Sequence, residues 1–174
     1  MKKQNRWKRL LAGVLAGLSL LPAVPQMAQA KEYWPDGISA ASPSTIVMEV
    51  NTGTILYEKK IHKQFYPASI TKIMTTLLAI ENCDMDEIVT FSADAVYNNE
   101  GDTSHIARDL DEQLTVEQCL YGIMLESANE CAYAIAEHVG QKLGGDYQTF
   151  IDLMNSRAKE LGCQDTHFNN CNGL

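Results

Sequence analysis

The sequence predicts an α/β fold of the α+β kind, in which a short N-terminal β-hairpin precedes a domain made mostly of helices. Two observations indicate this class. Residues 44–58 have the pattern of two strands around a turn, and after residue 67 the apolar residues recur mainly at helical spacing. The chain of 174 residues contains no internal repeat. This length favours one domain of modest size with a single core.

The first thirty residues have the three parts of a secretory signal peptide. A basic start precedes an apolar run over 10–21, and the small-residue motif Ala28-Gln29-Ala30 follows. The apolar run is shorter than the roughly 20 residues of a membrane-spanning helix, so a transmembrane anchor is the weaker interpretation. We therefore expect residues 1–30 to be cleaved and the protein to be exported, on the cell-wall or periplasmic side or secreted. The sequence leaves membrane attachment open.

Removal of this signal makes the chain strongly acidic. Five of its 14 Lys and Arg residues lie in the signal, whereas none of its 22 Asp and Glu residues does, so residues 31–174 carry a net charge of about −13. A surface of this sign repels nucleic acid and anionic lipid. We expect no nucleic-acid partner.

The cysteines lie in the exported part, where disulfides are permitted. They are Cys83, Cys119, Cys131, Cys163 and Cys171, and their odd number leaves at least one thiol free. Cys163, His167 and Cys171 resemble a metal-binding set, but zinc normally takes four ligands and no fourth lies nearby. We expect buried thiols or one structural disulfide, and no metal. His62, His105 and His138 are isolated in the sequence and receive no role.

The domain is expected to begin with the hairpin. Residues 31–43 are rich in Pro, Gly, Ser and Ala without a sustained period and are expected to form an exposed lead-in. Strands are then predicted over 44–50 and 54–58, and the residues at 51–53 tolerate the positive φ of a turn.

A helix over about 68–81 is the clearest local prediction. Pro67 stands where a helix can begin, and an apolar stripe at helical spacing follows it. Residues 87–91 are predicted as a short strand. Turn-forming residues dominate 92–114, with an extended piece expected at 104–110.

Three more helices are predicted in the second half of the chain, each with a recognisable boundary residue. Thr115 and Asp146 are typical N-caps, whereas Gly140 and Gly162 are typical stop signals. The expected helices cover 115–125, 131–139 and 146–161, and residues 126–129 interrupt the first two.

Ser69 and Lys72 form an S-x-x-K motif at the start of the helix predicted over 68–81. A separation of three residues places both side chains on one helix face. At the helix start, unpaired N–H groups and the helix dipole stabilise negative charge on a substrate oxygen. A lysine whose pKa is lowered by burial can act as a base toward the serine hydroxyl. The motif therefore supplies a nucleophile, a base and part of an oxyanion hole.

The motif alone is weak because Ser156 and Lys159 match it too. This second copy lies in the middle of a predicted helix, on the polar face, and we interpret it as solvated. Ser127 and Asn129 form the chain's S-x-N element, at the predicted break between two helices. Ser127 can relay a proton and Asn129 can hold the lysine and a substrate carbonyl, or the pair can be a polar turn that caps the next helix.

These motifs in this order resemble the low-molecular-mass penicillin-binding proteins, the serine-type D-Ala-D-Ala carboxypeptidases. The resemblance rests on Tyr-Pro-Ala-Ser-Ile-Thr-Lys-Ile-Met-Thr at 66–75, Ser-Ala-Asn at 127–129, the segment 158–168 and the Val-Asn-Thr-Gly turn at 50–53. It extends over about 44–174 and implies the N-terminal portion of a β-lactamase/transpeptidase-like serine acyl-enzyme fold.

The resemblance implies a role for each matching residue. Ser69 would be acylated by the D-Ala-D-Ala end of a peptidoglycan stem peptide, with Lys72 as general base, Ser127 as proton relay and Asn129 as substrate contact. β-Lactam antibiotics would acylate the same serine. No metal or organic cofactor is implied.

One departure from the family limits these expectations. Its members carry a third motif, Lys-Thr-Gly, on a strand beside the site, and no such triplet occurs in the 174 residues. Loss of one oxyanion donor costs about 10²- to 10³-fold in rate. We therefore expect a truncated product or fragment with weak or no activity. The alternatives are a serine β-lactamase and a non-catalytic module that binds muropeptides or penicillin.

Overall fold

The computed structural model describes residues 39–98 and 103–174. The predicted signal peptide and most of the predicted lead-in lie outside these residues. The chain divides into two units, Met1–Pro43 and Ser44–Leu174, and every element below belongs to the second unit.

The predicted hairpin is present and begins the second unit. Strands β1 (Thr45–Met48) and β2 (Ile55–Lys59) pair antiparallel, with Thr45 opposite Lys59. Gly53 takes a φ of +70° in the turn, which is the reason for a glycine there. The Glu49 carboxylate closes the same turn by accepting hydrogen bonds from the backbone N–H groups of Asn51 and Thr52.

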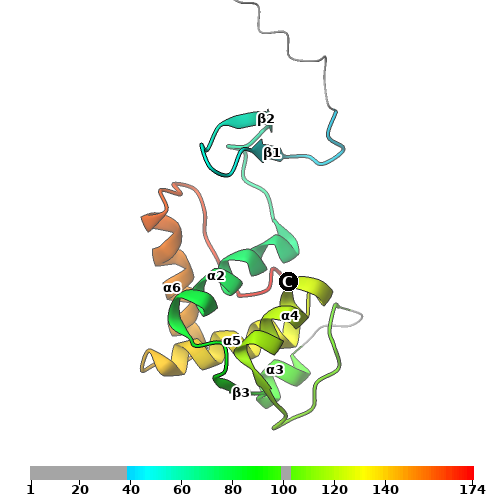
Figure 1. Ribbon diagram of the computed structural model, residues 1–174, viewed down its shortest axis with the longest axis vertical. Helices are drawn as coiled ribbons and strands as arrows, with labels where there is room; N and C mark the ends of the chain where they lie inside the picture. The colour runs from blue at the N-terminus through cyan, green and yellow to red at the C-terminus, as the bar shows by residue number, and fades with distance from the viewer. Residues whose placement is uncertain (1–38, 99–102) are drawn as a thin grey trace, which may run out of the picture. The chain divides into compact units, whose positions relative to one another are not determined.

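Helices make up most of the remainder, as the sequence predicts. A 3₁₀ turn, η1 (Ala68–Thr71), leads directly into α2. Figure 1 shows the helices gathered around α5, which packs against α2, α3, α4, α6 and β3. They are α2 (Lys72–Asn82), α3 (Ala93–Tyr97), α4 (Val116–Glu126), α5 (Asn129–Lys142) and α6 (Tyr147–Glu160).

The core forms around α5, in which nine of the fourteen residues are buried. Ile135 and Val139 of α5 are fully buried, together with Leu78 of α2, Phe150 of α6 and Phe91 after β3. Small residues let the neighbouring helices approach α5 closely, including Ala132, Ala134 and Ala136. The core therefore fixes the start of α2 relative to the start of α5.

Two of the predicted helix starts carry the expected caps. Thr115 and Gln118 form a capping box at the start of α4, and Asp146 and Thr149 form another at the start of α6. Gly162 takes a φ of +87° after α6, in agreement with its predicted role as a stop. Among the described residues, no helix has the length and the apolar character required to cross a bilayer.

The segment 92–114 differs from the prediction. Ser92 caps the short helix α3, and β4 (Gln113–Thr115) pairs with β3 (Ile88–Thr90), so that Leu114 lies opposite Val89. Residues 104–110 are irregular. Their N–H and side-chain groups bond locally or to α5, and this long-range pairing has no periodic signal in the sequence.

The predicted end of the helix at Gly140 is also wrong. Helix α5 continues to Lys142, so Gly140 lies inside it. A glycine is needed at this position because a Cβ atom there would lie 2.0 Å from the carbonyl oxygen of Asp146. The glycine therefore permits the turn into α6 to fold back onto α5.

Candidate active site

Ser69 and Lys72 come together at the junction of η1 and α2. Ser69 lies in the exposed 3₁₀ turn, whereas Lys72 is the first residue of α2 and is only 2% exposed. The Lys72 Nζ atom lies 3.1 Å from the Ser69 Oγ atom, within hydrogen-bond distance. The predicted position of Ser69 in the first turn of an α-helix is thus corrected to the 3₁₀ turn before it. The tighter turn follows a positive φ of 49° at Ala68.

Ser127 reaches the same amine from the end of α4. Its hydroxyl oxygen lies 3.3 Å from Lys72 Nζ. Ser127 is the C-cap of α4 and adopts a left-handed conformation with φ of 56°. This conformation ends α4 and lets α5 begin at Asn129, so the predicted interruption is present but is confined to residues 127–128. The left-handed conformation also turns the Ser127 hydroxyl toward the Lys72 amine.

The last residues of the chain supply a third acceptor that sequence reasoning missed. The carbonyl oxygen of Asn172 accepts a hydrogen bond from Lys72 Nζ at 3.0 Å. One turn further along α2, the buried Thr75 hydroxyl donates to the Cys171 carbonyl at 2.6 Å. The spacing of Ser69, Lys72 and Thr75 by threes is the signal that identifies Thr75. A backbone carbonyl has no such signal.

Gly173 packs directly against the turn that carries Ser69. Its φ is +88°, and a Cβ atom at this position would lie 1.9 Å from the carbonyl oxygen of Ala68. Only glycine accepts both conditions. The C-terminal segment therefore holds the Lys72 amine through Asn172 and supports the turn that carries Ser69 through Gly173.

Burial lowers the pKa of the Lys72 amine below its ordinary value, since the charged form loses its hydration. Negative charge on Cys171, when its thiol is ionised, and on Glu130 acts in the opposite direction. The three oxygen acceptors are hydroxyls and a carbonyl, which carry no full charge. The site thus holds a lysine that loses its proton more readily than a surface lysine.

Asn129 and Glu130 are the first two residues of α5, directly after the turn that carries Ser127, and both side chains are buried. The Asn129 N–H donates to the Ser104 carbonyl at 3.0 Å, and Glu130 Oε1 accepts from the Ile106 N–H at 2.5 Å. Within the described residues, Asn129 Oδ1 is buried without a hydrogen-bond partner and is not bonded to Lys72. An unpaired buried amide oxygen is costly unless another group meets it.

The other candidates from the sequence lie apart from this site. Ser156 and Lys159 are exposed on α6, as expected for a solvated face. Cys163 and His167 are exposed whereas Cys171 is buried, so the three do not form a common site. All five cysteines are free thiols, and Cys163 is the exposed one.

Comparison with known proteins identifies the family. A sequence model of the family described as D-alanyl-D-alanine carboxypeptidase matches residues 27–174. The chain belongs to this family. Among the family's curated members, the D-alanyl-D-alanine carboxypeptidase DacF of Bacillus subtilis (strain 168) is 36% identical in an alignment that covers 96% of this chain and 43% of DacF. The D-alanyl-D-alanine carboxypeptidase of Streptomyces sp. (strain K15) is 33% identical over 95% of this chain and 56% of its own.

Solved structures of D-alanyl-D-alanine carboxypeptidases and related enzymes share the fold. The carboxypeptidase DacD from Francisella tularensis superposes with a TM-score of 0.71 at 30% identity, over 90% of this chain and 38% of DacD. A mutant of the Streptomyces K15 DD-transpeptidase gives 0.71 at 31% identity, over 79% of this chain and 55% of that one. These neighbours confirm the predicted fold class. The chain spans about half the length of the curated relatives that it matches.

Proposed function

We propose that this chain carries the nucleophile and the general base of a serine-type D-Ala-D-Ala carboxypeptidase that acts on peptidoglycan stem peptides. The observation that carries the proposal is the buried Lys72 amine, which lies within hydrogen-bond distance of both Ser69 Oγ and Ser127 Oγ. Membership of the D-alanyl-D-alanine carboxypeptidase family agrees with this chemistry.

In the proposed acylation, neutral Lys72 removes the proton of the Ser69 hydroxyl as the oxygen attacks the carbonyl carbon of the penultimate D-alanine. The peptide C–N bond breaks, and the leaving D-alanine amine receives a proton from Lys72 through the Ser127 hydroxyl. A water molecule then attacks the ester carbonyl carbon and loses a proton to neutral Lys72. The bond between Ser69 Oγ and the acyl carbon breaks, Lys72 returns the proton to Ser69 Oγ, and the shortened peptide leaves.

Asn129 is proposed as the substrate contact. Its side chain is 2% exposed, and its amide oxygen lacks a hydrogen-bond partner among the described residues. A substrate N–H group is the kind of donor that would satisfy it. We do not assign it a bond to Lys72.

We also propose a class of covalent inhibitor and a location. β-Lactam antibiotics would acylate Ser69 and leave a long-lived penicilloyl ester. The signal-like residues 1–30 support export to the extracytoplasmic side, with Lys31 as the expected mature N-terminus.

Penicillin labelling tests the nucleophile. We expect a fluorescent penicillin to label the wild-type chain and Ser156→Ala equally and to leave Ser69→Ala unlabelled, as read on a denaturing gel and by intact mass. Ser156 is the matched control because it starts the second S-x-x-K motif. Equal labelling of all three chains would exclude Ser69, and no labelling of a chain that circular dichroism shows to be folded would favour a non-catalytic binding module.

The lifetime of the adduct distinguishes the carboxypeptidase from a serine β-lactamase. A penicilloyl mass that persists supports the proposal, whereas rapid hydrolysis of penicillin contradicts it. Release of D-alanine from a peptide ending in D-Ala-D-Ala, but not from one ending in L-Ala-L-Ala, is the corresponding substrate test.

A further inference from the structure

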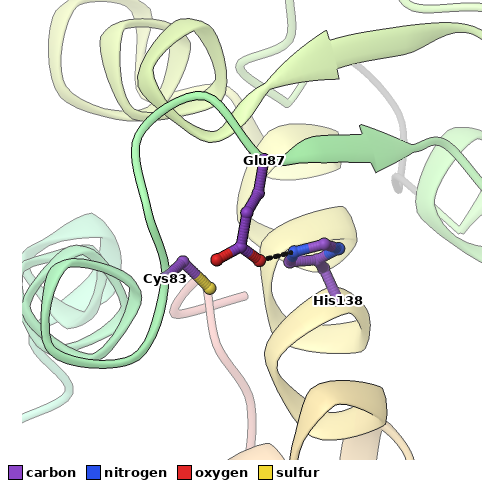
Figure 2. Close-up of side chains that lie close together, drawn as sticks. All are labelled: Cys83, Glu87 and His138. Atoms are coloured by element: carbon purple, nitrogen blue, oxygen red, sulfur yellow. Dashed lines mark hydrogen bonds and ion pairs between the residues drawn. The ribbon is translucent and has the colours of Figure 1, made fainter.

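A second cluster of reactive side chains lies at the opposite end of α2 from Lys72. Figure 2 shows the Cys83 thiol, the Glu87 carboxylate and the His138 imidazole facing one another. One ligand atom from each of the three lies within 4.8 Å of both others. Cys83 follows the last residue of α2, Glu87 precedes β3, and His138 belongs to α5. Three separate segments therefore meet at one point.

The folded chain holds two of the three side chains toward this point. Glu87 Oε1 accepts a hydrogen bond from the Asp84 N–H at 2.7 Å, and Glu87 Oε2 lies 3.0 Å from His138 Nε2. Glu87 and His138 are partly exposed, with 23% and 22% of their side chains accessible, whereas Cys83 is buried. An ion can reach the cluster from solvent, and the thiol closes its inner side.

We infer that Cys83, Glu87 and His138 form a binding site for a Zn²⁺ ion, with water as the fourth ligand. A thiolate, an imidazole and a carboxylate together are typical of zinc, whereas calcium and magnesium prefer sets made of oxygen alone. At ordinary zinc bond lengths, tetrahedral ligand atoms lie roughly 3.3 to 3.8 Å apart. Shifts of about 1 Å or less bring the three atoms to these distances.

Lys142 is the group that the ion would displace. Its amine pairs with Glu87 Oε1 and is on a side chain that is 41% exposed. A lysine on a flexible four-carbon stem can turn into water at little cost. On binding, the ion takes the Glu87 carboxylate and the His138 Nε2 lone pair, and the Cys83 thiol releases its proton to solvent as the Zn–S bond forms.

The position of the cluster gives the ion a structural role. Helix α2 has 11 residues and is therefore about 16 Å long, so the cluster and Lys72 lie at opposite ends of this helix. It would join the end of α2, the start of β3 and the C-terminal part of α5. This inference does not depend on the proposed function.

Cobalt substitution of the full 174-residue chain tests the thiol ligand. After removal of metals with a chelator and exchange into clean buffer, Co²⁺ should bind one to one and give a thiolate-to-cobalt band in the near ultraviolet. Cys83→Ser should lose the band, and the control Cys163→Ser, which removes the exposed cysteine, should keep it. A missing band in the wild type, or a band retained by Cys83→Ser, would overturn the site.

Zn²⁺ competition with a chromophoric chelator tests the other two ligands. His138→Gln and Glu87→Gln should raise Kd at least about 100-fold, since even loss of an outer-shell partner costs about 10- to 100-fold. The surface change Lys142→Met should lower Kd several-fold, because it frees Glu87 without removing a ligand. This variant keeps the test valid if a ligand variant does not fold. An unchanged or higher Kd for Lys142→Met contradicts the proposed ligand set.

Discussion

Lys72 combines a buried amine with acceptors that carry no full charge. Burial lowers the pKa of this amine, so its neutral form, which can take a proton from Ser69, is more accessible than in a surface lysine. Arginine at the same position would keep its charge at every usable pH. The protonation state of this one residue thus controls the proposed nucleophile.

The first prediction concerns the pH dependence of acylation. Burial lowers the Lys72 pKa, so the neutral fraction, and with it the rate constant for acylation by penicillin, should rise with pH and level off below the ordinary lysine value of 10.5. Lys72→Arg should abolish acylation. Stopped-flow or quench-flow labelling across pH measures both, and Lys159→Arg serves as the exposed control. An unaltered profile in Lys72→Arg would exclude Lys72 as the base.

Ser127 has two roles that substitutions can separate: its hydroxyl is the proposed proton relay, and its left-handed backbone ends α4. Its φ of 56° is unfavourable for any residue with a Cβ atom, by about 1 to 2 kcal/mol. Ser127→Gly should therefore raise the free energy of unfolding by about 1 kcal/mol, whereas Ser127→Ala should not. Both should slow acylation because both remove the hydroxyl. Urea denaturation and penicillin labelling measure the two effects, and full labelling of either variant would rule out the relay.

At the level of elements, the geometry of the site depends on the close contact between the C-terminal segment and the turn η1. Gly173 and Gly162 have nearly the same φ, +88° and +87°, but a Cβ atom at Gly162 meets nothing within 4 Å. Both alanine variants carry the strain of a left-handed residue. Only the change at Gly173 also displaces Ala68, beside Ser69.

We therefore expect Gly173→Ala to slow penicillin acylation by at least about 10-fold and Gly162→Ala to leave it nearly unchanged. The factor corresponds to about 1.4 kcal/mol of lost transition-state stabilisation. Both variants should lose stability in urea, about 1 kcal/mol for Gly162→Ala and more for Gly173→Ala. Equal acylation by the two variants would show that the close approach at Ala68 has no part in the site.

The elements also show which information a sequence contains. Boundaries set by local chemistry were predictable, such as the caps at Thr115 and Asp146 and the stop at Gly162. The extended piece expected at 104–110 is irregular, and the helix end predicted at Gly140 is wrong, because tertiary contacts override local preference there. The same reasoning applies to the candidate site. Ser69, Lys72 and Ser127 are identifiable by residue type, whereas the Asn172 carbonyl and the cluster around Cys83 depend on how distant segments meet.

At the scale of the whole molecule, the stability of the second unit depends most directly on the packing of the other elements against α5. It contacts four helices and β3, and Ile135 at its centre is fully buried. Ile135→Ala should lower the free energy of unfolding by about 2 to 5 kcal/mol, the usual cost of such a cavity. The control Ile80→Ala, on α2 with 55% of the residue exposed, should cost much less. Urea unfolding followed by circular dichroism compares them, and equal losses would mean that α5 is not the centre of the core.

The three acceptors of the Lys72 amine lie 3, 55 and 100 residues away from it in the sequence. The first is available as soon as η1 forms, and the second requires α4 to pack. The third requires the chain to be synthesised almost to its last described residue. Contacts over such separations close late, because the entropy of the intervening loop has to be overcome first. The full set of hydrogen bonds at the Lys72 amine therefore forms only when segments 100 residues apart in the sequence have packed together.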